Sequence, residues 1–203
     1  MREFELSEDY QLRVAEDNII FNEYPTGTAL NTSTLSTRLS TQTVTVGSNR
    51  WELNSSGITT INTGSMLRTN RTFMWHKANA LYGECALAWT SAPTATWVAE
   101  WGFFNTTTAI GLITDGVFFR ITAGQFRGVI CNNSVETIVD LGALPASSDV
   151  HDLVIEMCQD TVYFWHEGLL LGKLDVPPTQ FAPMGLAQCQ YAVRTYNGGV
   201  ALC

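Results

Sequence analysis

The sequence predicts an all-β fold, an antiparallel β-sandwich. Short apolar alternations follow one another from Trp97 to Leu174, separated by pairs such as Asp115-Gly116, Asn132-Asn133 and Glu167-Gly168. These pairs tolerate positive φ and are typical of tight hairpin turns. No segment of ten or more residues repeats its apolar side chains with the 3.6-residue period of a helix. Many short strands with regular turns are typical of a sandwich or a barrel.

The first part of the chain differs in composition from the rest. Residues 1–23 are acidic with scattered apolar residues, and residues 25–43 are almost all Pro, Thr, Gly, Ser, Asn, Leu and Ala. Such a composition cannot bury enough apolar surface to fold alone. We therefore predict an extended N-terminal arm over residues 1–42 and a β-sandwich domain over residues 43–203. A flexible tail and an arm that becomes ordered on a neighbouring subunit both fit this composition.

The strands of the sandwich are predicted from the apolar alternation, in chain order. The pattern begins with predicted strands at residues 44–46 and 51–53. The strand at 97–103 opens the longest uninterrupted series of predicted strands. The remaining predicted strands cover residues 72–75, 85–89, 109–113, 117–121, 126–131, 135–139, 153–157, 162–166, 169–174, 184–189, 192–196 and 200–202.

Alternation also predicts which side chains face the core. In the strand at 97–103, Trp101 and Phe103 share a face that is typical of core, and Glu100 points the other way. Arg120 and Glu156 lie on the same kind of face in their own strands. We expect these three charged residues to form a row of exposed cross-strand ion pairs.

The strand at 162–166 is apolar on both faces and so needs cover on both sides. We expect Val162, Phe164 and Leu171 to point into the sandwich. Tyr163 and Trp165 then lie on the opposite face, where a ligand or a partner would bind.

Charge and residue spacing exclude several classes of function. The net charge is −8 and only 15% of residues are charged, which argues against a surface for nucleic acid. No apolar run reaches the length of a membrane-spanning helix, and no apolar leader follows Met1, so we expect folding in a cytosol.

The five cysteines are dispersed, which predicts free thiols. The histidines, at positions 76, 151 and 166, show no metal-ligand spacing, so we expect neither a metal nor a cofactor.

Segments spread over residues 71–196 resemble the concanavalin A-like jelly-roll domains of tailed-bacteriophage structural proteins. The resemblance lies in Arg71-Thr72-Phe73, Ala99-Glu100-Trp101-Gly102-Phe103-Phe104, Asp115-Gly116-Val117-Phe118-Phe119-Arg120, Gly128-Val129-Ile130, His151-Asp152-Leu153-Val154-Ile155-Glu156, Val162-Tyr163-Phe164-Trp165-His166-Glu167-Gly168 and Arg194-Thr195-Tyr196-Asn197-Gly198-Gly199. It implies a virion component of the capsid decoration, cement, neck or fibre type, assembled in the host cytoplasm. Its partners would be other virion proteins and further copies of this chain.

The rival hypothesis is a lectin-like module that binds carbohydrate for host attachment. The six tryptophans suit a sugar-stacking platform, a sandwich core or subunit contacts, and alternation favours core for most of them. Tyr163, Trp165, Glu100, Arg120 and Glu156 are the candidate contacts for a partner or a glycan. Laminarinase-like enzymes of this fold carry an E-x-D-x-E strand, whereas Glu100 and Glu156 each stand alone on their strands. We therefore predict no catalytic residue and no enzyme.

Overall fold

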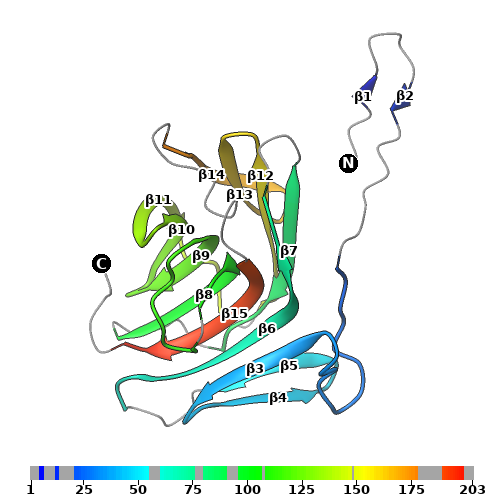
Figure 1. The fold of residues 1–203 in the computed structure, drawn as a ribbon, viewed down its shortest axis with the longest axis vertical. Helices are drawn as coiled ribbons and strands as arrows, with labels where there is room; N and C mark the ends of the chain where they lie inside the picture. The colour runs from blue at the N-terminus through cyan, green and yellow to red at the C-terminus, as the bar shows by residue number, and fades with distance from the viewer. Residues whose placement is uncertain are drawn as a thin grey trace.

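The computed structural model describes residues 5–6, 12–13, 21–54, 60–75, 80–90, 96–106, 108–147, 149–177 and 189–198. Its strands form two large sheets and two small ones (Figure 1). Every pairing between these strands is antiparallel. The predicted all-β fold is therefore confirmed. Within the described residues, no helix is long and apolar enough to cross a membrane.

The larger sheet has seven strands in the order β11-β10-β9-β8-β15-β6-β3. Their bounds are β3 Leu35–Ser40, β6 Thr63–Phe73, β8 Trp97–Phe104, β9 Gly116–Thr122, β10 Gln125–Asn132, β11 Val135–Ala143 and β15 Cys189–Asn197. The smaller sheet has four strands in the order β14-β13-β12-β7. Their bounds are β7 Leu81–Leu87, β12 His151–Cys158, β13 Thr161–His166 and β14 Leu169–Asp175.

Two-residue turns set the register of the hairpins. Ala123 and Gly124 between β9 and β10 both have positive φ, as do Glu167 and Gly168 between β13 and β14. Two successive residues with positive φ are typical of a type I′ turn, whose backbone twist matches that of the two strands it joins. The turn between β10 and β11 is Asn133-Ser134, one residue later than the predicted Asn132-Asn133.

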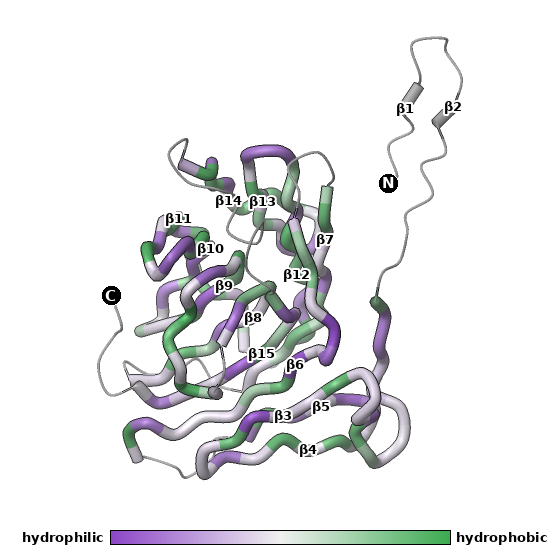
Figure 2. The backbone as a smooth tube through the Cα atoms, in the orientation of Figure 1, coloured by the Kyte–Doolittle hydropathy of each residue, from purple (hydrophilic) through white to green (hydrophobic). Residues whose placement is uncertain are grey.

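The main core lies between the two large sheets. The rings of Trp101, Phe119 and Phe126 lie nearly parallel in one cluster with centroids 5.4–6.1 Å apart, and Phe164 of the smaller sheet meets Phe119 edge-on at 5.1 Å. A Cβ at Gly128 would lie 2.6 Å from the Phe164 ring, so only glycine lets the two sheets approach this closely. Hydrophobic and hydrophilic stretches alternate along the strands, as Figure 2 shows.

Residues 109–113, predicted as a strand, form a loop instead. Ala109 and Ile113 are buried in a second apolar cluster with Phe104 and Phe118, on the face of the larger sheet that points away from the main core. The Asn105 side-chain oxygen anchors the loop by accepting bonds from residues 114 and 115. The alternation in this segment therefore arises from covering a sheet, not from joining one.

The larger sheet begins before the predicted domain boundary. Strand β3 pairs along β6, and Leu35 is buried, so the sheet includes residues that were assigned to the arm. Phe21 also packs edge-on against Phe73 of the core at 6.3 Å. Strands β4 (Thr43–Gly47) and β5 (Arg50–Asn54), where the sandwich was expected to start, pair only with each other.

Strands β1 (Glu5–Leu6) and β2 (Leu12–Arg13) form a short two-stranded sheet. Two predicted strands lie outside the described residues. One is 200–202, and the other is 184–189, of which the structure describes the last residue. The sequence also predicts that residues 1–40 pack outside the sandwich, largely against another chain. Leu35–Ser40 instead form strand β3 of the larger sheet, and contact of the arm with another chain stays a prediction.

Candidate functional site

Four polar and aromatic residues meet on the outer face of the smaller sheet: Tyr82, Glu156, Tyr163 and Trp165. We call them the outer aromatic face. Glu156 on β12 lies directly opposite Tyr82 of β7 on one side and Tyr163 of β13 on the other. Trp165 follows two residues after Tyr163 and therefore shares its face. Strand register alone brings these side chains together.

Glu156 organises this face through hydrogen bonds to both of its carboxylate oxygens. The Tyr82 hydroxyl donates to Oε1 at 3.0 Å, and the Trp165 indole Nε1 donates to Oε2 at 2.9 Å. The Cys158 thiol also donates to Oε1, at 3.3 Å. Burial, this hydrogen bond and the Glu156 charge raise the pKa of Cys158 to about 11, which keeps the thiol protonated. The carboxylate therefore holds two aromatic rings in fixed orientations.

The aromatic rings of this face reach solvent to different degrees. Tyr82 is 59% exposed, while Tyr163 and Trp165 are half-buried, with ring centroids 6.4 Å apart. The predicted orientation of this strand is confirmed, because Val162 and Phe164 are fully buried on the opposite face.

Glu100 and Arg120 form a buried network, so the expected row of exposed ion pairs is wrong. Glu100 is 0% exposed and accepts from Arg120 Nε at 2.6 Å and from Arg194 Nε at 2.5 Å. Arg120 binds Glu136 through two further bonds of 2.7 Å each. Burial alone would lower the pKa of Arg120, but the hydrogen bond to Glu136 and the charges of Glu100 and Glu136 outweigh burial and raise it.

The described residues of the loop between β8 and β9 contribute to this burial. Its Gly111 carbonyl accepts a bond of 2.6 Å from Arg194, so the loop closes over the network. Glu156 belongs to the other sheet, so it cannot join a row with Glu100 and Arg120. Of the predicted contacts, the structure unites Tyr163, Trp165 and Glu156 and separates Glu100 and Arg120 from them.

Sequence reasoning missed Tyr82, Glu136 and Arg194. Tyr82 lies in β7, which begins at Leu81, whereas the predicted strand started at residue 85. A correct strand boundary would have marked Tyr82 as an outward-facing aromatic. Only the pairing of distant strands shows that it meets Glu156.

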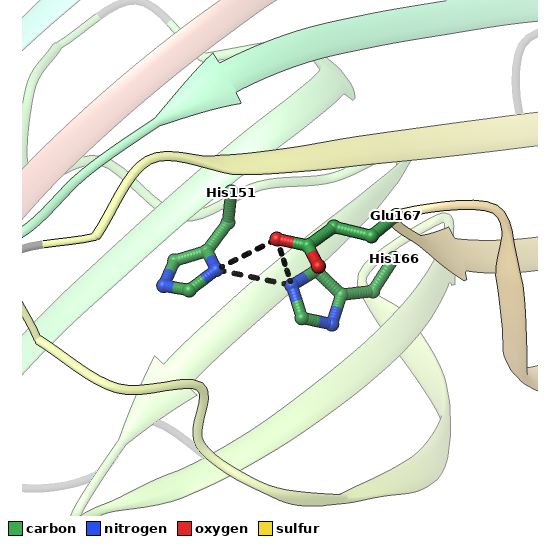
Figure 3. Close-up of side chains that lie close together, drawn as sticks. All are labelled: His151, His166 and Glu167. Carbon is green, nitrogen blue, oxygen red and sulfur yellow. Dashed lines mark hydrogen bonds and ion pairs between the residues drawn. The ribbon is translucent and has the colours of Figure 1, made fainter.

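His151, His166 and Glu167 gather at one end of the smaller sheet (Figure 3). One ligand atom from each residue lies within 4.8 Å of the other two. The expectation of no metal rested on spacing along the chain. Here strand pairing brings together two histidines that are 15 positions apart.

No protein-family model matches the chain, and no curated protein matches it. Several solved structures have a similar fold. The Crh5 transglycosylase aligns with a TM-score of 0.59 and 16% identity over 88% of this chain and 68% of its own. The potassium-bound carbohydrate recognition domain of Emp46p aligns with a TM-score of 0.58 and 9% identity over 83% of each chain. The carbohydrate-binding module CBM66 from Bacillus subtilis aligns with a TM-score of 0.52 and 10% identity over 80% of this chain and 90% of its own.

These likenesses show the fold, a concanavalin A-like jelly-roll sandwich shared with a transglycosylase, a carbohydrate recognition domain and a carbohydrate-binding module. The sequence-based exclusion of an enzyme is contradicted, because a transglycosylase shares this fold over most of the chain. None of the three structures named above is described as a virion component. The phage origin, the virion partners and the virion location stay predictions.

Proposed function

We propose that this protein binds carbohydrate on the outer aromatic face. The observation that carries the proposal is the Trp165–Glu156 hydrogen bond of 2.9 Å, which fixes an aromatic ring beside a hydrogen-bond acceptor. This pair suits sugar recognition, because a pyranose ring presents apolar C–H faces and a rim of hydroxyl groups. The fold supports the proposal, since carbohydrate recognition domains and modules are built on it.

Each residue of the outer aromatic face has a defined role in this proposal. The rings of Trp165 and Tyr163 pack against the apolar face of a sugar. A carboxylate offers about four lone-pair positions. Tyr82, Trp165 and Cys158 take three of them on Glu156, which leaves capacity for one sugar hydroxyl. The hydrogen bonds within the protein orient the face before the ligand arrives, which lowers the ordering cost of binding.

Glycan-array screening followed by calorimetry on the best oligosaccharide tests the proposal. We expect Trp165→Ala to weaken binding at least tenfold, because alanine removes both the stacking ring and the partner that orients Glu156. Trp51→Ala is the matched control, since Trp51 lies in the separate β4–β5 hairpin. Equal affinity for Trp165→Ala and the wild type would refute the proposed site.

The same sugar should also be incubated with the protein and its products separated by chromatography. Cleaved or transferred glycosidic bonds would show that binding serves a reaction. Unchanged sugar would identify a binding module.

Assembly into a homo-oligomer is a second candidate, in line with the predicted structural role. The edge strands β11 and β14 carry exposed apolar side chains, including Val135, Ile138, Leu169 and Leu170. Exposed apolar edges are typical of subunit contacts. Light scattering on the full chain gives the test, and a monomer at all concentrations would reject this candidate.

A further inference from the structure

The cluster of His151, His166 and Glu167 has the shape of a metal-binding site. His151 is the first residue of β12, His166 is the last residue of β13, and Glu167 opens the turn to β14. The His166 Nε2 atom lies 3.1 Å from His151 Nδ1. One oxygen of Glu167, Oε1, lies 3.6 Å from each of these two nitrogens (Figure 3).

This triangle has the dimensions of three corners of a metal coordination shell. Sides of 3.1, 3.6 and 3.6 Å give a circumscribed circle with a radius of about 2.0 Å. Zn²⁺ binds imidazole nitrogen and carboxylate oxygen at about 2.0–2.2 Å. An ion slightly out of the plane of the three atoms is therefore at bonding distance from all of them without movement of a side chain.

The surroundings of His151 orient the correct nitrogen toward the cluster. Its Nε2 lies 2.8 Å from the backbone oxygen of Ala146, and a carbonyl can only accept, so Nε2 carries the proton. The lone pair of Nδ1 then faces His166 and Glu167. The buried ring also packs on Trp89, with centroids 4.9 Å apart. A ligand histidine whose second nitrogen donates to a carbonyl is the usual arrangement around protein-bound metals.

The position of the Glu167 backbone is also fixed by its local structure. Glu167 has a left-handed φ of 50°, and its N–H donates to the Asp152 carbonyl at 2.9 Å. Its side chain is 59% exposed, so one side of the cluster opens to solvent. Three protein ligands and an open side leave a fourth coordination position for water.

Among the described residues, one hydrogen bond joins the three ligand atoms of this cluster. His166 Nε2 can donate to His151 Nδ1, but the carboxylate oxygen at 3.6 Å is too far from either nitrogen for a hydrogen bond. Two acceptors, the Nδ1 lone pair and the carboxylate, then face a single proton. A divalent cation satisfies all three ligand atoms together.

We propose that His151, His166 and Glu167 bind one divalent transition-metal ion of the Zn²⁺ class. Imidazole nitrogen with carboxylate oxygen selects this class over Ca²⁺ or Mg²⁺, which prefer oxygen ligands throughout. The proposal stands apart from the sugar-binding face, because it uses none of its residues.

Titration of the chelator-treated full chain with Co²⁺ tests the site. We expect one ion per chain, a visible d–d band, and a higher melting temperature when Zn²⁺ or Co²⁺ is present. His166→Gln and Glu167→Gln should each weaken binding at least tenfold. Both residues reach solvent, so these variants should still fold. Glu84→Gln is the matched control, an exposed carboxylate on β7 of the same sheet that should leave binding unchanged.

Three outcomes would overturn the proposal. One is no saturable binding of Co²⁺ or Zn²⁺. A second is a near-ultraviolet thiolate-to-cobalt band, which would place the ion on cysteines. The third is equal affinity in His166→Gln and the wild type. Sugar affinity measured in the same variants separates this result from the fate of the proposed carbohydrate site.

Discussion

Replacing Glu100 with glutamine should destabilise the fold strongly, because Glu100 is the shared partner of two buried arginines. The side chains of Arg120 and Arg194 are only 8% and 2% exposed. Glutamine keeps the shape but removes the negative charge, and its amide turns N–H donors toward guanidinium donors. Arg120 retains Glu136, whereas among the described residues Arg194 retains the Gly111 carbonyl and two aromatic rings but no carboxylate.

The size of the effect follows from charge interactions in a poorly solvated site. At an effective dielectric constant of about 20, opposite charges about 4 Å apart attract by about 4 kcal/mol. Glu100→Gln loses two such attractions and recovers several kcal/mol of carboxylate desolvation. The net loss is about 3–5 kcal/mol, the range found when one partner of a buried ion pair is removed. This is a large part of the roughly 5–15 kcal/mol that stabilises a typical domain.

Urea unfolding followed by tryptophan fluorescence measures this loss. Glu52→Gln is the control, because the Arg50–Glu52 pair is exposed and should contribute at most about 1 kcal/mol. Unfolding free energies of Glu100→Gln and Glu52→Gln that agree within about 1 kcal/mol would refute the buried network. They would instead support the exposed ion pairs that the sequence predicted.

The remaining predictions use the same unfolding measurement. Phe164→Ala should lower the free energy of unfolding by about 3–5 kcal/mol, since it removes the ring that contacts Phe119 in the main core. Trp165→Ala should cost less in folding than Phe164→Ala and more in sugar binding. A collapsed fold in Trp165→Ala together with a mild loss in Phe164→Ala would mean that the two faces of β13 are exchanged. Burial raises the pKa of Cys131 and of Cys189 to about 12, above the value of 9.0 for an ordinary thiol. Unfolding then releases protons above pH 9, so stability should fall as the pH rises from about 9 toward 12. Stability that stays constant over this range would contradict the burial of these thiols.

Much of the fold was predictable because hairpins are local. The turn at Glu167-Gly168, and the alternation of Val162 and Phe164 with Tyr163 and Trp165, depend on neighbours within a few residues. These features predicted both the hairpin and the orientation of its side chains. The four cysteines in the described residues are free in the structure. The prediction of five free thiols awaits thiol counting.

The errors share one physical origin, the inability of local patterns to show what covers a strand. Ala109 and Ile113 alternate as strand residues do, yet they belong to a loop packed on the larger sheet. Alternation predicts that Glu100 points outward to solvent, yet Glu100 is buried against Arg120 and Arg194, and that same loop binds Arg194. Strand β3 lies in a segment with the composition of a linker, yet it pairs along β6 at the edge of the sheet.

The sequence by itself determined most of the strands and turns after Trp97 and the inward face of β13, because backbone preference and alternation act over a few residues. Tertiary structure alone decided which distant side chains meet. Register between β7, β12 and β13 places Tyr82 and Trp165 on Glu156, and pairing of β12 with β13 brings His151 to His166. Those meetings depend on strand order and register across the whole sheet, and no spacing along the chain encodes them.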